Sequence, residues 1–204
     1  MLDCQSLTTV FFTINQSKVA KNQSYVIIEP MENEPIRKEI DGVTFLSTGK
    51  YHDGINKWVS HKLKEDDYEV IDYAARSISR LLPSNAVIIP MPGHKGEPDH
   101  TMKLARAIAS YTHLPVLDAL RGRERESQYE AKHHGRPLTE SQMGFRRILP
   151  LPSDRVPYIL DNVVDTGITA KAAVKALGGG NVVSYAMSDV LLTEKHEVKQ
   201  CFQR

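Results

Sequence analysis

The chain contains little cysteine and almost no net charge. Its two cysteines, Cys4 and Cys201, stand near opposite ends of 204 residues, which is too few for a zinc ribbon or a disulfide framework. This scarcity fits a reducing compartment, and we expect a cytoplasmic protein. The formal charge of +1 at pH 7 gives no general attraction to nucleic acid or to an acidic membrane. Nucleic acid is therefore not an expected partner, and an anion site must arise from local placement of charge.

Long apolar runs are also missing. No stretch approaches the roughly 20 apolar residues that span a bilayer, and the first five residues include no basic segment followed by an apolar run. We therefore expect neither secretion nor a membrane partner. What is present is a hydrophobic share of 41% and a charged share of 25%, which at this length indicates one globular domain, or a domain with a small appendage.

The first third of the chain is expected to be β-rich. Residues 9–14 and 25–28 are runs of β-branched and aromatic residues, and 43–46 is a third candidate strand after an Asp-Gly turn. No chemical motif lies here. We predict that residues 1–48 form a β-rich N-terminal appendage, either a small sheet packed on the main domain or a hood that contributes to a base-binding pocket.

Residues 49–204 are predicted to form an α/β core. Helical spacing covers 55–63 and 68–82, residues 86–90 read as a central parallel strand, and 101–112 read as the next helix. Further strands are expected at 114–117, 158–164 and 182–187, with a helix over 170–177 that ends at three glycines. Residues 120–145 are polar and charged without apolar periodicity. The alternation predicts a parallel sheet that binds ligands at the carboxyl ends of its strands.

The most informative motif joins the strand at 158–164 to the helix at 170–177. Its turn places hydroxyls and an unobstructed glycine backbone at a helix N-terminus, where partial positive charge favours a phosphate. Carboxylates directly upstream suit sugar hydroxyls or a metal-bound ligand. A strand followed by an ordinary capped helix is the alternative interpretation. The motif consists of Asp161, Asn162, Val163, Val164, Asp165, Thr166, Gly167, Ile168 and Thr169.

A second candidate anion site follows the strand at 86–90. Glycines there allow backbone N–H groups to approach an anion, and a lysine adds a point charge. A common tight turn is the alternative. The residues concerned are Met91, Pro92, Gly93, His94, Lys95 and Gly96.

These two motifs, in this order, resemble the type I phosphoribosyltransferases, whose phosphoribosyl pyrophosphate loop reads as an apolar strand, two acidic residues, two apolar residues and a D/T-T-G-x-T turn. Residues 89–94, Ile-Pro-Met-Pro-Gly-His, resemble the V-P-V-P-x-H of ComF-type members. Weaker similarities are Gly49-Lys50-Tyr51, the segment 104–109 and the segment 121–128, so the resemblance covers roughly residues 50–192. One position departs from the pattern, because Asn162 replaces the second acidic residue.

The resemblance implies a type I phosphoribosyltransferase core that transfers a phosphoribosyl group to or from a nitrogenous base, with pyrophosphate as the leaving group. It implies Asp161 and Asn162 on the ribose, residues 166–169 on the 5′-phosphate, residues 91–95 on pyrophosphate and Asp165 as a general base. Mg²⁺ would be the cofactor, held mainly by the ligand and by Asp161 as one protein carboxylate. A homodimer is implied as well.

The segment containing Arg121, Arg123 and Arg125 occupies the place of the family's long flexible loop, which closes over the substrate. Guanidinium groups match the oxygens of a pyrophosphate, so closure would neutralise the leaving group. The alternative is a solvated surface loop. His133 and His134 lack a carboxylate or cysteine at ligand spacing, and we interpret them as exposed loop histidines.

Two further functions stay open. Because an amide supplies no charge to balance magnesium or a ribosyl cation, Asn162 also fits a non-catalytic regulator that senses phosphoribosyl pyrophosphate or a nucleotide. A ComF-like accessory of DNA uptake is the third possibility, although the N-terminal cysteine cluster common in such proteins is absent from this sequence.

Overall fold

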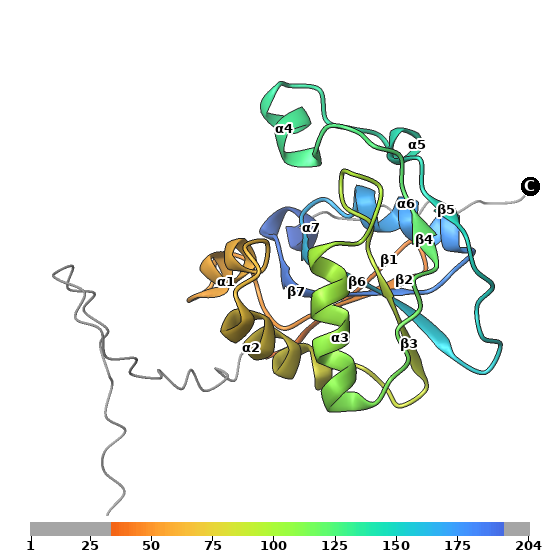
Figure 1. Cartoon of the computed structure of the whole chain (residues 1–204). Helices are drawn as coiled ribbons and strands as arrows, with labels where there is room; N and C mark the ends of the chain where they lie inside the picture. The colour runs from red at the N-terminus through yellow and green to blue at the C-terminus, as the bar shows by residue number, and fades with distance from the viewer. Residues whose placement is uncertain (1–33, 194–204) are drawn as a thin grey trace, which may run out of the picture.

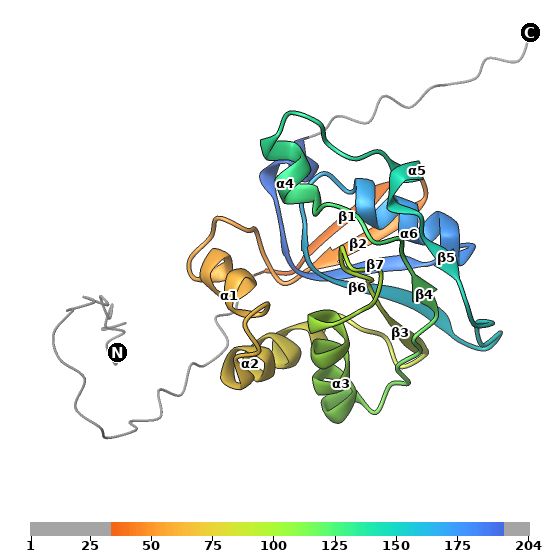
Figure 2. The ribbon, with the colours of Figure 1, turned by 45° about the horizontal axis from the view of Figure 1, so that its top comes forward.

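The computed structural model describes residues 34–193 and shows an α/β protein with a mostly parallel five-stranded sheet. The order across the sheet is β1-β2-β7-β6-β3 (Figures 1 and 2). The strands are β1 (Ile36–Ile40), β2 (Val43–Ser47), β3 (Ala86–Pro90), β6 (Val156–Val164) and β7 (Asn181–Met187). β1 and β2 pair in antiparallel fashion, and the pairs β2–β7, β7–β6 and β6–β3 are parallel.

Helices cover both faces of this sheet. Before β3 come α1 (Asn56–Lys62) and α2 (Tyr68–Ser79), and α3 (His100–Thr112) follows β3. The second face is covered by α6 (Ile168–Leu177), and α7 (Asp189–Thr193) ends the described chain. β4 (Leu120–Arg121) and β5 (Arg146–Arg147) form a two-stranded ribbon, and the chain between them forms two short helices. α4 (Gln128–His133) projects from the main body (Figure 1), whereas α5 (Glu140–Met143) contacts α6.

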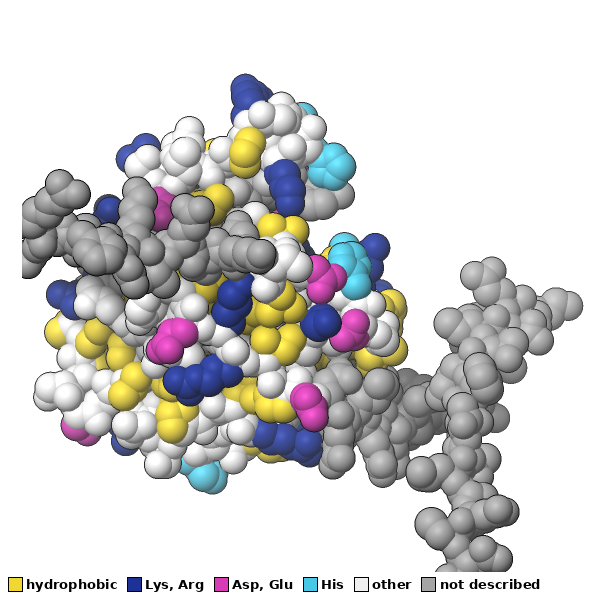
Figure 3. Space-filling model, turned by 180° about the vertical axis from the view of Figure 1, so that it is seen from behind, with side chains coloured by type: hydrophobic (Ala, Val, Ile, Leu, Met, Phe, Trp, Pro, Cys, Tyr) yellow, Lys and Arg dark blue, Asp and Glu magenta, His cyan; other side chains and the backbone are white. Residues whose placement is uncertain are grey.

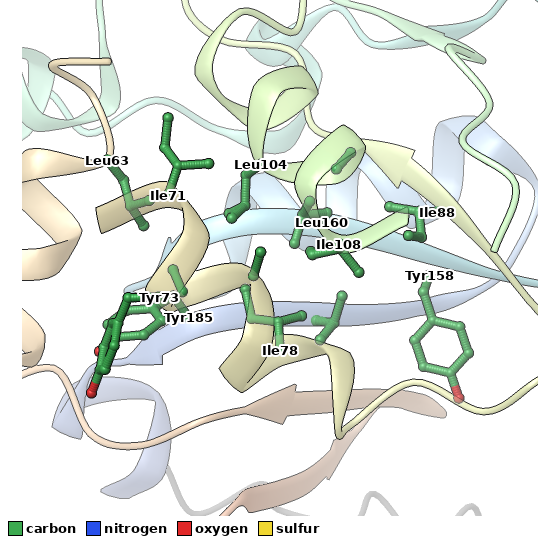
Figure 4. Packing of buried hydrophobic residues seen from close by; sticks show 14 of the residues in the cluster. Leu63, Ile71, Tyr73, Ile78, Ile88, Leu104, Ile108, Tyr158, Leu160 and Tyr185 are labelled. Carbon is green, nitrogen blue, oxygen red and sulfur yellow. The ribbon is translucent and has the colours of Figure 1, made fainter. Parts of the chain in front are cut away.

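The core follows from the apolar periodicity of these elements. On one face, α2 and α3 bury Ile78, Leu104 and Ile108 against Leu160 and other strand residues (Figure 4). On the other face, the alanine-rich helix α6 packs against a second cluster of strand side chains. All five residues of β3 are buried. Apolar burial on two faces of one sheet is what a parallel α/β arrangement requires.

Most elements lie where the sequence predicts them, including the strands at 86–90, 158–164 and 182–187. Two expectations were wrong. β3 is the last strand in the sheet order, not a central one, and 114–117 is not a strand but makes one bridge, from Val116 to Ile88. Pro115 accepts a hydrogen bond from the N–H of Ile88 but has no N–H to donate, so it cannot extend a ladder. This segment still covers the open edge of β3.

The predicted strand at 43–46 is present as β2, and it extends the main sheet through its pairing with β7. The predicted strands at 9–14 and 25–28 lie outside the described residues. The division of the chain at residue 48 therefore stays a prediction. Within residues 34–193, no helix has the length and apolar character needed to cross a membrane.

Candidate functional site

The two predicted ligand-binding turns leave adjacent strands at the same edge of the sheet. β3 and β6 are hydrogen-bonded neighbours, with Pro90 opposite Leu160. The N–H of Met91, the first residue after β3, donates to the carbonyl of Leu160 at 3.0 Å. β6 continues to Val164, so Asp161 follows directly on the residue that meets the 91–96 turn. The fold thus brings together the turn after β3, the end of β6 and the start of α6, as the carboxyl edge of a parallel sheet does.

The turn after β3 is held by its own backbone. The N–H of Gly93 donates to the Glu97 carbonyl at 2.9 Å, and the N–H of Gly96 donates to the Gly93 carbonyl at 3.1 Å. These N–H groups are therefore engaged, and the groups that the turn presents to solvent are the side chains of His94 and Lys95, both exposed. Met91 and Pro92 are buried. An anion here would be met by the Lys95 ammonium group and the His94 imidazole rather than by the N–H groups of Gly93 and Gly96.

The turn between β6 and α6 requires its glycine. Gly167 has φ of +78°, and a Cβ at this position would lie 3.0 Å from Cδ1 of Leu191. No side chain caps α6, and within the described part of the chain the hydroxyls of Thr166 and Thr169 make no hydrogen bond. The first N–H groups of a ten-residue helix, with two hydroxyls beside them, are thus available to an anion.

Asp161 and Asn162 lie at the centre of this edge and differ in environment. Asp161 is half-buried, and its Oδ1 accepts a hydrogen bond from the N–H of Asn162 at 2.8 Å. Burial raises the pKa of Asp161 to about 6, against the opposing effects of backbone N–H groups and of the Lys64 and Arg125 cations. The raised pKa of a carboxyl near two cations is a feature of functional sites.

The amide of Asn162 is 2% exposed. Within the described residues, neither its Nδ2 nor its Oδ1 has a hydrogen-bond partner. Buried polar groups are nearly always hydrogen-bonded, so an amide without a partner calls for an explanation. A functional constraint at this position is one such explanation.

Asp165 is contacted from two directions. Its Oδ1 accepts a hydrogen bond from the hydroxyl of Ser188 at 2.8 Å, and its Oδ2 lies 2.9 Å from Nζ of Lys132 on α4. Ser188 follows β7, and its N–H donates to the carbonyl of Val164. The carboxylate is therefore held beside the turn that precedes α6.

The segment between β4 and β5 has more structure than its polar sequence indicated. Ser127 and Glu130 form a capping box at the start of α4, and the N–H of Thr139 donates to Gln142 at 2.8 Å before α5. Both follow the S/T-x-x-E/Q pattern, the signal that identifies such short helices. Arg125 reaches the turn after β3, because its N–H donates to the His94 carbonyl and its guanidinium to the Gly93 carbonyl.

The three predicted arginines of this segment have different roles. Arg121 is paired through both terminal nitrogens with Asp118. Arg125 also lies over the ring of Phe145, 5.5 Å from its centroid, and burial lowers its pKa. Arg123 has an exposed side chain. Arg125 thus borders the site, whereas Arg121 is occupied by a neighbouring carboxylate.

Sequence reasoning missed Lys132, Ser188 and Lys64. Their contacts come from elements distant in the chain, and no local motif marks them. His133 and His134 are exposed, as interpreted, but His133 is the last residue of α4 and not part of a loop. Nδ1 of His134 lies 2.6 Å from Oε1 of Glu126. Even so, residues 34–193 contain no group of three or more His, Cys, Asp or Glu side chains that could hold a metal. The expectation of Mg²⁺ carried by a ligand, with Asp161 as a protein carboxylate, stays a prediction.

Comparison with protein-family models gives no match, and comparison with curated proteins gives none either. Function is therefore inferred from the geometry of this edge.

Proposed function

We propose that this protein binds phosphoribosyl pyrophosphate and transfers its phosphoribosyl group to or from a nitrogenous base, as in type I phosphoribosyltransferases. One observation carries the proposal: the turn after β3 and the turn before α6 leave neighbouring strands, joined by the Met91–Leu160 hydrogen bond. A ligand with a phosphate at one end and a diphosphate at the other needs two anion sites on either side of a sugar site. Asp161 and Asn162 occupy the position between the two turns.

In this proposal each group has a distinct task. The uncapped start of α6, with Thr166 and Thr169, binds the 5′-phosphate, and Asp161 accepts hydrogen bonds from ribose hydroxyls. His94 and Lys95 bind the diphosphate. Mg²⁺ on the diphosphate would make it a better leaving group, and the carboxylate of Asp161 fits the small number of protein ligands that this ion takes.

The transfer itself breaks the bond from C1 of the ribose to the diphosphate oxygen, which departs with the electron pair. The lone pair of a ring nitrogen of the base forms the new bond to C1. Asp165 receives the proton that this nitrogen loses, as a general base whose carboxylate is oriented by the Ser188 hydroxyl at 2.8 Å. Charge placement is the main contribution of the protein.

The second candidate is a regulator that binds the same ligand without turnover. Asn162 favours it, because the amide carries no charge to stabilise a ribosyl cation. A ComF-like accessory role predicts nucleic-acid binding that weakens steeply with salt. On the face of the molecule turned away from the viewer in Figure 1, basic and acidic side chains are interspersed (Figure 3). This face therefore lacks the continuous basic surface that nucleic-acid binding requires.

Two measurements separate these functions. Release of pyrophosphate from phosphoribosyl pyrophosphate across a panel of purine, pyrimidine and other nitrogenous bases would support catalysis. A ligand-induced rise in Tm without turnover would support sensing. The variant Asn162→Asp restores the second carboxylate and is expected to raise turnover in the catalytic case. The matched variant Asn56→Asp changes another buried asparagine outside the proposed site and controls for general effects. No rise in Tm with any phosphorylated ribose would refute both candidates.

A further inference from the structure

α4 is joined to the turn before α6 through Lys132. Nζ of Lys132 lies 2.9 Å from Oδ2 of Asp165, which links residues that are 33 positions apart. α4 itself is held in place by its capping box and by the backbone bond from Arg125 to His94. The helix therefore presents a cation at the edge where the proposed ligand binds.

The arginines that the sequence predicts as partners of the pyrophosphate are less suited to binding an anion. Arg121 is paired with Asp118, and Arg125 is held by the Gly93 carbonyl and the Phe145 ring. The side chain of Lys132 is 54% exposed, so its long stem can reorient in solvent. An exposed ion pair contributes only about 0–1 kcal/mol, and a ligand of higher charge can displace it.

Asp165 would stay in place without Lys132, because the Ser188 hydroxyl binds its other oxygen. An uncompensated carboxylate directly before the start of α6 would repel an anionic ligand. Lys132 cancels this charge in the free protein. When a phosphate with more than one negative charge enters, the stronger attraction for the ammonium group lies with the ligand.

We infer that Lys132 is a further ligand-binding residue, which pairs with Asp165 in the free protein and turns to the anionic group of the bound phosphorylated ligand. The inference rests on the proposed function and adds a specific residue to it. The exchange also frees the Oδ2 atom of Asp165 at the moment when a general base is needed.

Titration calorimetry tests whether Lys132 moves from Asp165 to the ligand. The two probes are phosphoribosyl pyrophosphate and inorganic pyrophosphate, both with Mg²⁺. A charge-assisted hydrogen bond predicts that Lys132→Met weakens binding of phosphoribosyl pyrophosphate about tenfold or more, whereas Lys132→Arg keeps most of the affinity. Lys175→Met is the matched control. Lys175 is exposed at the far end of α6, about 12 Å along the helix from Gly167, so its effect is screened and affinity should be unchanged.

A second readout needs no ligand. If the ion pair holds α4, Lys132→Met and Asp165→Asn will each accelerate millisecond hydrogen exchange over residues 128–133, and the double variant will add little to either single one. Equal binding by wild type and Lys132→Met would overturn the inference alone. If the effect of the double variant equals the sum of the two single effects, the two residues do not interact in the free protein, and the inference is overturned as well. Failure of the wild-type protein to bind either probe would overturn the proposed function and the inference together.

Discussion

Replacing Asn162 with leucine should stabilise the free protein. Leucine has the same branched, four-atom side chain without polar atoms. The amide of Asn162 is buried and has no partner for Nδ2 or Oδ1 within the described residues. Leaving a polar group buried and unpaired costs about 1–3 kcal/mol. Asn162→Leu should therefore raise the free energy of unfolding by about this amount, less any cost of repacking.

Asn56→Leu is the matched control, since Asn56 is 1% exposed and both its amide nitrogen and its amide oxygen are hydrogen-bonded. Its Nδ2 donates to the Lys50 carbonyl at 2.8 Å, and its Oδ1 accepts from the Tyr185 hydroxyl at 3.0 Å. The same substitution there removes the acceptor of the buried Tyr185 hydroxyl and one of the two donors to the Lys50 carbonyl, which keeps its hydrogen bond from the N–H of Asp53. We expect it to lower the free energy of unfolding by about 1–3 kcal/mol.

The assay is urea unfolding of the wild type and the two variants, followed by fluorescence. The free energies of unfolding are compared on condition that the three m-values agree. Thermal unfolding should show opposite shifts of roughly 2–4 °C per kcal/mol for the two variants. Equal destabilisation by both substitutions would refute the reasoning, because it would mean that the Asn162 amide is hydrogen-bonded in the free protein.

Three other predictions concern neighbouring residues. Burial raises the pKa of Asp161 from 3.8 to about 6, so the folded state holds the proton more tightly than the unfolded state, and stability is lost as pH rises from about 4 to 6. The free energy of unfolding of Asp161→Asn should therefore equal that of wild type near pH 4 and exceed it at pH 8, by at most about 3 kcal/mol. A difference in urea unfolding that stays constant with pH would contradict this. Arg125→Met removes a cation that lowers this pKa, so carboxyl NMR should find a higher pKa for Asp161 in the variant than in wild type. An unchanged titration would place Arg125 outside the site. Gly167→Ala should lower Tm more than Gly42→Ala. The two glycines have similar φ, +78° and +76°, but only a Cβ at position 167 would lie against Leu191. Equal shifts in Tm would show that backbone conformation alone sets the cost of the substitution.

Some of the site could be read from local sequence because local rules govern it. The strand-turn-helix pattern over 158–177 identified β6, the turn and α6, since apolar runs, glycine and alanine-rich segments specify backbone conformation over a few residues. The same holds for 86–90 and for α3. The parallel sheet then followed from the alternation of strands and helices.

Other features lacked a local signal or were missed. The capping pairs Ser127–Glu130 and Thr139–Gln142 were present in the sequence and would have predicted α4 and α5. The last place of β3 in the sheet order was not predictable, because burial by helices and by the segment at 115–117 makes an edge strand as apolar as a central one.

The sequence by itself determined where the chain turns, which turns carry glycine and hydroxyls, and which residue replaces the second carboxylate. These properties depend on the chemistry of neighbouring residues. Only the tertiary structure decided that Lys132 and Ser188 both contact Asp165, and that burial raises the pKa of Asp161. It also decided that the Asn162 amide is buried without a partner among the described residues. Each of these depends on elements that folding brings together from distant parts of the chain, because burial and charge act through space rather than along the sequence.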